Sequence, residues 1–279
     1  MNRQNIGVML SGHRDTDYAA RFREAREMGL SSCQISLWDP SLYTDRTAQE
    51  IRSAMQQENF RVSLLWAGWS GPCEWNFSAG PDTIGLVPPA YRHKRLEELI
   101  AASDFAEKIG VTDIATHVGF IPENPADPNY PGLTAALRFL CRYMQRKGQF
   151  FLFETGQETP VTMLRTIERI GLDNLGINFD TANLILYGRG NPVDAIRVFG
   201  KFIRNTHIKD GFYPTDGENL GVEVKVGQGL CDLPRILHAL RDIGYSGPYT
   251  IEREISGDEQ KKDIADTLLL LQNLLGRDG

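Results

Sequence analysis

The 279-residue chain contains no apolar run long enough to cross a membrane, and Met1 to Asn5 lack a charged-then-apolar secretion signal. Its four cysteines form no C-x-x-C pair, so we expect reduced, mostly structural thiols. The formal net charge is −6, and no basic stripe interleaved with aromatic residues offsets it. These absences predict a cytoplasmic protein without a membrane or nucleic-acid partner.

Hydrophobic periodicity indicates a regular alternation of strands and helices. Eight strands are expected, at 5–10, 32–38, 61–67, 113–118, 149–154, 175–180, 203–208 and 248–253. Eight helices are expected, at 17–28, 47–58, 89–109, 133–147, 160–170, 191–199, 232–243 and 257–275. This count, together with a length near the ~250 residues usual for the fold, predicts an α/β protein with a closed (β/α)8 TIM barrel. No linker is evident, so residues 1–279 are expected to form a single domain.

The expected loops differ at the two ends of this barrel. The helix-to-strand connections are short, whereas the strand-to-helix connections 67–88, 119–132 and 211–230 are long. Long loops in a compact barrel usually carry function. The carboxyl ends of the strands are therefore where we expect the site.

Four metal-ligand side chains lie at the carboxyl ends of consecutive expected strands: Glu154, Asp180, His207 and Glu252. Parallel strands would carry all of them to one end of the barrel. A single acidic residue there is weak evidence, because such residues also cap helices. Burying three carboxylates together without a cation, however, is strongly unfavourable. The group predicts one divalent metal ion, with Mn²⁺, Co²⁺ or Mg²⁺ favoured by the oxygen ligands and Zn²⁺ left open.

The surroundings of these residues resemble a known family. Glu154 lies in Phe-Glu-Thr-Gly, Asp180 in Asn-Phe-Asp-Thr-Ala-Asn, His207 begins His-Ile-Lys-Asp, and Glu252 lies in Ile-Glu-Arg-Glu. These segments resemble the sugar phosphate isomerase/epimerase group of xylose isomerase-like TIM barrels, which includes the tagatose and psicose 3-epimerases. The resemblance implies that all four residues bind one metal and that Glu154 and Glu252 also form the catalytic acid/base pair.

The chain departs from this family pattern at two positions. Asn183 stands where the epimerases commonly have a histidine, and Lys225 is the nearest basic residue to their arginine after strand seven. Asn183, Lys225 and the nearby Gln157 are candidates for binding sugar hydroxyls. An amide at a strand end is about as often a turn or cap residue.

Three further candidates for substrate binding are His117, Lys209 and Trp66. His117 ends the fourth expected strand, although a histidine beside apolar residues is often a satisfied core residue. Lys209 shares the strand parity of His207, and its alternative role is a salt bridge to a neighbouring strand. Trp66 begins an aromatic group that suits the apolar face of a sugar but also suits loop packing, and its other members are Trp69, Trp75 and Phe77.

These features favour a metal-dependent isomerase or epimerase of an unphosphorylated ketose or keto-polyol, which would bind a small sugar or polyol and no organic cofactor. The reaction would remove a proton next to a carbonyl polarised by the metal. A dehydratase or lyase of the same superfamily begins in the same way and remains an alternative. An abasic-site endonuclease would need more than the five histidines present, and a non-catalytic sugar-binding barrel would not need both glutamates. The sequence leaves open whether the protein is a homo-oligomer.

Overall fold

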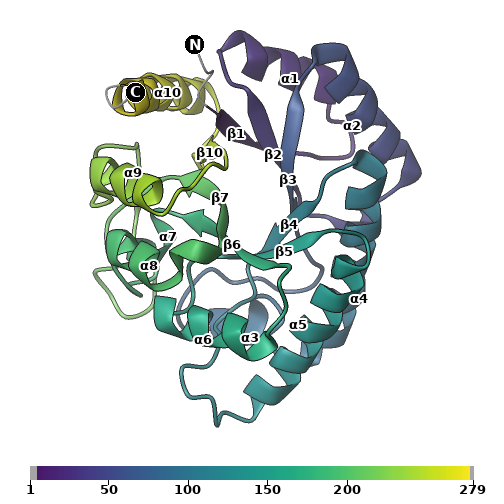
Figure 1. Ribbon diagram of the computed structural model, residues 1–279, viewed down its shortest axis with the longest axis vertical. Helices are drawn as coiled ribbons and strands as arrows, with labels where there is room; N and C mark the ends of the chain where they lie inside the picture. The colour runs from purple at the N-terminus through teal and green to yellow at the C-terminus, as the bar shows by residue number, and fades with distance from the viewer. Residues whose placement is uncertain (1–4, 277–279) are drawn as a thin grey trace.

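The computed structural model describes residues 5–276 and contains a closed barrel of eight parallel strands. Around the barrel the strands follow the order β1-β10-β7-β6-β5-β4-β3-β2, so consecutive βα units lie next to one another (Figure 1). The barrel strands are β1 (Ile6–Ser11), β2 (Ser32–Leu37), β3 (Arg61–Ala67), β4 (Asp113–Thr116), β5 (Phe150–Glu154), β6 (Leu175–Asp180), β7 (Ile203–Ile208) and β10 (Tyr249–Ile251). The predicted (β/α)8 fold is confirmed.

Eight long helices surround the strands (Figure 1). They are α1 (Tyr18–Glu27), α2 (Asp45–Glu58), α4 (Pro89–Ile109), α5 (Asn129–Gln145), α6 (Pro160–Ile170), α8 (Pro192–Phe199), α9 (Leu233–Asp242) and α10 (Asp258–Gly276). Helix α5 begins four residues before the predicted start at 133, because Pro131 is tolerated in the first turn of a helix. No helix within residues 5–276 is both long and apolar enough to span a membrane.

Short elements that the sequence did not predict occupy the connections. They are η1 (Pro40–Leu42), α3 (Gly80–Thr83), α7 (Asn183–Leu186), η2 (Gly200–Phe202) and the antiparallel pair β8 (Asp210–Gly211) and β9 (Glu223–Val224). Most of them lie in strand-to-helix connections, so they give fixed structure to the loops that face the carboxyl ends of the strands. Such pieces are too short to show a periodic pattern.

Three strands end earlier than predicted, β2 by one residue, at Leu37, and two others by two residues. Strand β4 stops at Thr116 and β10 at Ile251, so His117 and Glu252 each follow a strand directly. The pairing of β10 with β1 also ends early, at Val8 and Ile251. The last residues of β1 therefore pair with β2 alone.

The barrel interior has an apolar part and a polar part. A compact cluster fills one part of it, formed by Leu64, Trp66, Trp69, Ile84, Ala115 and Leu152. Buried amides fill another part, where Gln34 Nε2 donates to Asn178 Oδ1 at 3.1 Å and to Thr250 Oγ1 at 3.3 Å. A separate and much larger apolar cluster packs the strands against the surrounding helices. The buried amides are hydrogen-bonded, as burial requires.

A buried carboxylate organises the long connection from β7 to α9. Asp210 accepts four backbone N–H groups at 2.9 Å each, from Gly211, Gly227, Gly229 and Cys231. Its side chain is almost fully buried, at 1% exposure. Carboxylates accept such bonds strongly. Asp210 therefore holds the start of this connection, at Gly211, close to its last part, from Gly227 to Cys231.

We predict that Asp210→Asn lowers the free energy of unfolding by roughly 2–4 kcal/mol, because an amide NH₂ cannot accept the N–H groups that one carboxylate oxygen now satisfies. Urea denaturation measures this change. The matched control is Asp216→Asn in the same connection, where an exposed carboxylate caps its own turn. Equal effects of the two substitutions would contradict the assigned role of Asp210.

Candidate active site

The four predicted metal ligands meet at the carboxyl end of the barrel. One ligand atom from each of Glu154, Asp180, His207 and Glu252 lies within 4.8 Å of the others. His207 Nδ1 is 3.0 Å from Glu154 Oε1, 3.1 Å from Glu252 Oε2 and 3.8 Å from Asp180 Oδ2. The two glutamates thus approach the same nitrogen of the imidazole. Three oxygen ligands and one nitrogen ligand form a donor set that suits a divalent cation.

Asp180 has one oxygen that is satisfied and one that is not. Its Oδ1 accepts the backbone N–H groups of Ala182 at 2.7 Å and Asn183 at 2.8 Å, at the start of α7. Its Oδ2 is buried and has no hydrogen-bond partner among residues 5–276. Burial raises the pKa of Asp180 to about 6, although Lys209 opposes the rise. A cation held between the four side chains would give Oδ2 its missing partner, so the residues fit a metal ion.

Buried amides fix which nitrogen of His207 faces the carboxylates. His207 Nε2 lies 2.7 Å from Gln34 Oε1, which can only accept, and 3.2 Å from Asn178 Nδ2, which can only donate; the shorter contact to Gln34 assigns the hydrogen to Nε2. Asn178 Nδ2 in turn donates to Glu154 Oε2 at 3.1 Å. His207 Nδ1 can then offer its lone pair to a metal, in the arrangement by which outer hydrogen bonds usually orient a histidine ligand. Neither Gln34 nor Asn178 was predicted from the sequence.

The charges in this cluster are strongly coupled. Burial opposes protonation of His207, but Glu154 and Glu252 outweigh burial and raise the pKa of His207 well above its usual value. Burial likewise opposes ionisation of Glu252, yet His207 and Lys209 hold its pKa far below the usual value. A proton on His207 Nδ1 and a bound metal ion would each offset the negative charge of these carboxylates. Both need the lone pair of the same nitrogen, so they compete for it.

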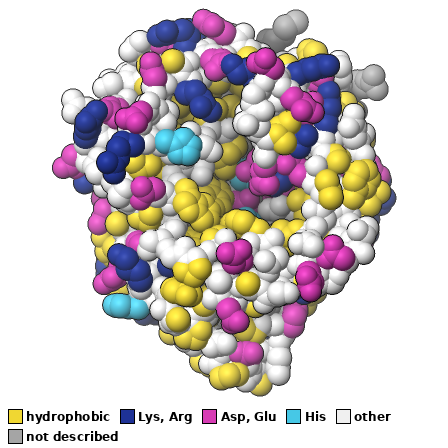
Figure 2. All heavy atoms as spheres, turned by 180° about the vertical axis from the view of Figure 1, so that it is seen from behind, with side chains coloured by type: hydrophobic (Ala, Val, Ile, Leu, Met, Phe, Trp, Pro, Cys, Tyr) yellow, Lys and Arg dark blue, Asp and Glu magenta, His cyan; other side chains and the backbone are white. Residues whose placement is uncertain are grey.

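A cavity of about 390 Å³ opens directly above the cluster. Its lining includes both glutamates and four of the six predicted substrate-binding residues, namely His117, Asn183, Lys209 and Trp66. Apolar and aromatic side chains complete the wall, among them Trp38, Trp75, Leu186, Tyr187 and Leu220. Figure 2 shows a hollow in the molecular surface with acidic side chains beside it and hydrophobic side chains around it. An acidic floor and an aromatic wall are well suited to a polyhydroxylated ligand.

Three of the four tryptophans of the chain line this wall, and the buried Trp69 packs behind them. Trp38 stacks on Trp66 at 5.5 Å between ring centroids and also contacts Trp69 at 5.0 Å and Trp75 at 6.2 Å. Trp38 and Trp75 remain 38% and 40% exposed, so their rings are accessible to a ligand. Trp66 Nε1 donates to Glu154 Oε2, which ties the wall to the metal cluster. The sequence analysis missed Trp38, although its position directly after β2 was a usable signal.

Arg95 of α4 holds the loop that carries this wall. Its guanidinium lies over the rings of Trp69 and Tyr91, at 5.2 and 4.7 Å from their centroids. It donates to four backbone carbonyls of the loop, those of Ser70, Pro72, Thr83 and Gly85. Arg95 is 1% exposed, so these bonds are made away from water, where they strongly constrain the backbone.

His117 and Gln157 form a buried pair. Gln157 Nε2 is 3.2 Å from His117 Nδ1 and 3.0 Å from Tyr187 Oη. Burial lowers the pKa of His117, which keeps its ring neutral with Nε2 toward Glu154 at 3.8 Å. Gln157 does not line the cavity. The Nε2 amide of Gln157 orients His117 and Tyr187, and direct binding of sugar by Gln157 stays a prediction.

The two predicted lysines lie in different places. Lys209 is buried beside the cluster, where Nζ donates to Glu254 Oε1 at 2.6 Å and to Glu252 Oε2 at 3.4 Å. Lys225 is absent from the cavity lining and forms ion pairs with Asp263 and Asp266 of α10. These ion pairs hold the side chain of Lys225 outside the cavity lining, and its role in sugar binding stays a prediction.

We predict that Gln34→Leu weakens divalent-metal affinity about 10–100-fold, because His207 would lose the acceptor that fixes its tautomer. Calorimetric titration of chelator-treated protein with Mn²⁺ measures the change. The matched control is Gln149→Leu, which removes another buried amide, one bonded to Ser103 and distant from the cluster. Unchanged Mn²⁺ affinity in Gln34→Leu would show that His207 does not bind metal through Nδ1.

A curated protein matches part of this chain in sequence. An uncharacterized protein of Methanocaldococcus jannaschii is 32% identical over 121 residues, which cover 41% of this chain and 38% of that protein. The matched region therefore spans well under half the length of this relative.

Solved structures match over nearly the whole chain. A xylose isomerase domain protein from Planctomyces limnophilus has 36% identity and a TM-score of 0.89, covering 97% of both chains. The 3-keto-D-glucoside 4-epimerase of E. coli has 18% identity and a TM-score of 0.72, covering 97% of this chain and 99% of that one. A D-psicose 3-epimerase solved in the presence of D-fructose has 14% identity and a TM-score of 0.72, covering 98% and 100%. The last two matches show the fold alone.

The family comparison covers most of the chain. The model described as "Xylose isomerase-like TIM barrel" matches residues 22–274. This match agrees with the family predicted from the segments around the four metal-ligand residues, and with a closed barrel that carries those residues at the carboxyl ends of its strands. The chain belongs to the xylose isomerase-like TIM barrel family.

Proposed function

We propose that this protein is a divalent-metal-dependent isomerase or epimerase of a ketose or keto-polyol. The observation that supports this most strongly is the placement of Glu154 and Glu252. Both carboxylates approach His207 Nδ1 from different strands, and both also line the cavity above it. A ligand in that cavity would lie against two carboxylates at once, as a proton transfer between two faces of one carbon requires.

Glu154, Asp180, His207 and Glu252 would hold the cation. When bound, a divalent cation polarises a carbonyl and makes the neighbouring C–H more acidic. One glutamate takes this proton on its carboxylate, and the other returns a proton from the opposite face, which inverts the carbon. His207 holds the pKa of Glu154 below its usual value against the effect of burial, so that carboxylate is ionised and ready to act as a base.

Other side chains of the cavity would orient the sugar. Asn183 and Lys209 present polar atoms beside Glu252, and His117 lies beside Glu154. Trp38 and Trp75 offer partly exposed rings to the apolar C–H face of a sugar. We assign binding of the sugar hydroxyls to Asn183, Lys209 and His117, and its stacking surface to the tryptophan wall.

The charge around α10 favours an unphosphorylated substrate. The first turn of α10 carries Asp258 and Glu259, which occupy the positive end of the helix dipole and would repel a phosphate dianion. Lys225, in the connection from β7 to α9, is already paired with two carboxylates of α10. Arg253, in the connection directly before α10, is paired with Glu223 and Asp263. The usual phosphate position of a TIM barrel is therefore acidic here.

The histidines disfavour a multi-zinc endonuclease. Of the five in the chain, only His117 and His207 line or form the site. His93 and His238 lie on outer helices with side chains 88% and 71% exposed, and His13 is exposed as well. A dehydratase would share the first proton-transfer step with an epimerase, so the products must distinguish these two activities.

We predict that the Mn²⁺-loaded protein exchanges one carbon-bound hydrogen of its substrate for deuterium in D₂O. A panel of free ketoses followed by NMR and mass spectrometry reports both the exchanged carbon and any loss of water. Glu154→Gln and Glu252→Gln should each lower turnover by at least about 100-fold, because general acid–base catalysis contributes that much. Chelation should abolish the exchange.

The control for this experiment is Glu98→Gln, which alters a buried glutamate bonded to Ser70 outside the cluster. Near-normal turnover in either active-site glutamine variant would remove that glutamate from the acid/base pair. Full activity of metal-free protein would contradict the metal requirement. Loss of water from the sugar without epimerisation would instead assign a dehydratase.

We predict that free sugars are better substrates than their phosphate esters. The comparison uses matched sugar and sugar-phosphate pairs, with kcat/KM as the measured quantity. Asp258 and Glu259 should disfavour the ester through repulsion. A preference of about tenfold for the ester, equivalent to about 1.4 kcal/mol in transition-state binding, would overturn this part of the proposal.

A further inference from the structure

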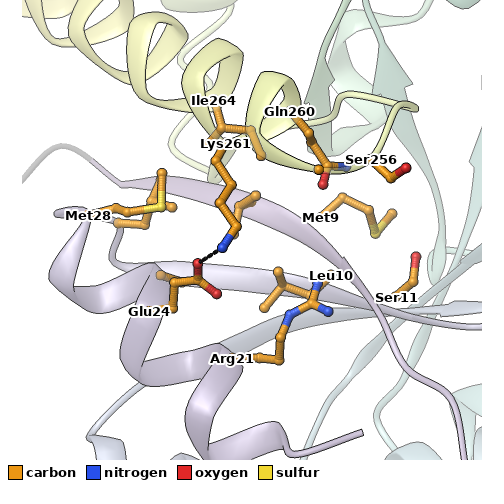
Figure 3. A pocket seen from close by; sticks show the side chains of 14 residues that line it. Met9, Leu10, Ser11, Arg21, Glu24, Met28, Ser256, Gln260, Lys261 and Ile264 are labelled. Carbon is orange, nitrogen blue, oxygen red and sulfur yellow. Dashed lines mark ion pairs between the residues drawn. The ribbon is translucent and has the colours of Figure 1, made fainter.

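A second cavity of about 360 Å³ lies between α1 and α10, beside the end of β1 (Figure 3). The exposed side chains of Ser11 and Ser256 give it hydroxyl groups. Leu10 of β1, Met28 after α1 and Ile264 of α10 face one another as its apolar walls, and the lining also includes polar side chains, namely Arg21, Gln260 and the paired Glu24 and Lys261. No step of the proposed reaction uses this cavity.

The second cavity adjoins the first through a gap in the barrel wall. Pairing between β1 and β10 ends at Val8 and Ile251, so β10 does not cover the β1 edge beyond that point. The chain after β10 turns away instead, and the backbone N–H of Glu254 donates to Glu223 Oε2 at 3.1 Å, beside β8 and β9. Met9 and Ser11 consequently border both cavities.

We propose that the two cavities form one elongated binding site whose substrate is a substituted sugar. This inference rests on the proposed function and adds a substrate class to it. The sugar ring lies over the metal-ligand cluster, and a substituent on the ring passes Ser11 and enters the groove between α1 and α10. The apolar walls of the groove fit an aryl or alkyl aglycone, and the hydroxyls of Ser11 and Ser256 lie where the glycosidic oxygen would pass.

The sizes and charges of the cavities agree with a two-part ligand. Each cavity alone is near the lower end of the ~300–1,000 Å³ typical of small-molecule sites, and the two together lie well inside that range. Lys261 at the edge of the groove is paired with Glu24 at 2.6 Å, so it brings no free charge. Arg21 has no ion pair or side-chain hydrogen bond shown among residues 5–276 and lies exposed at the mouth. The charge of Arg21 is thus solvated, and the apolar side chains of Leu10, Met28 and Ile264 remain as the contact surface for an aglycone.

The chemistry restricts this substrate further. A glycosidic bond at the anomeric carbon of an ordinary ketose uses up its carbonyl, which is then no longer available for polarisation. A glycoside that reacts by proton transfer next to a carbonyl must therefore carry its ketone at another ring carbon. The inferred substrate class is a keto-glycoside with an apolar aglycone.

The test compares binding of the methyl and phenyl glucosides of 3-keto-glucose to the Mn²⁺-loaded full-length chain by calorimetry. The phenyl glucoside should bind about tenfold more tightly, because its ring buries apolar surface in the groove. Met28→Trp should fill the groove and abolish this preference. The matched control, Glu27→Trp, alters the exposed neighbouring residue outside the groove and should keep the preference.

Ile264→Ala provides a second variant that does not depend on filling the groove, and it should reduce the preference by removing one wall. An affinity for the phenyl compound no higher than for the methyl compound, including no binding of either, would overturn the inference. So would an unchanged preference in Met28→Trp and Ile264→Ala. Deuterium exchange measured in parallel separates the two proposals: binding preference without exchange would refute the catalytic function alone, and exchange without preference would refute the elongated site alone.

Discussion

The convergence of three buried carboxylates on His207 Nδ1 is the constraint on which the rest of this site depends. Glu154, Asp180 and Glu252 come from three different strand ends, and like charges so close together are costly to bury. The chain offsets part of this cost with His207 and Lys209, yet Asp180 Oδ2 accepts no hydrogen bond from the residues that the structure describes. This remaining imbalance is the physical reason to expect a divalent cation there.

The barrel is built to keep this cluster in one geometry. Below it, Gln34 and Asn178 form a hydrogen-bonded layer that orients His207 and Glu154. Above it, Arg95 binds four carbonyls of the tryptophan loop, and Asp210 binds four N–H groups of the connection after β7. Buried charged groups with several backbone partners hold long loops firmly, so the cavity walls are as well defined as its floor.

The early end of β10 leaves part of the β1 edge uncovered, next to the groove proposed to bind the substituent of the substrate. A β10 that continued along β1 would seal the barrel wall beside Met9 and Ser11. Because the chain turns toward Glu223 instead, the edge of β1 beyond Val8 stays uncovered, while the backbone N–H of Glu252 still donates to Ile208 of β7. Pairing with β7 thus places Glu252, and the turn that follows borders the proposed route to the groove between α1 and α10.

The sequence by itself determined the barrel and its four metal-ligand positions. Alternation of strand and helix patterns sets the topology, and parallel strands necessarily bring Glu154, Asp180 and His207 to one end. Only the tertiary structure decided the roles of Gln34, Trp38 and Lys225. Gln34 contacts His207 from β2 across the barrel interior, and Lys225 is turned by carboxylates of α10. Such contacts depend on how the sheet closes and where each strand ends, and a local pattern of residues contains neither.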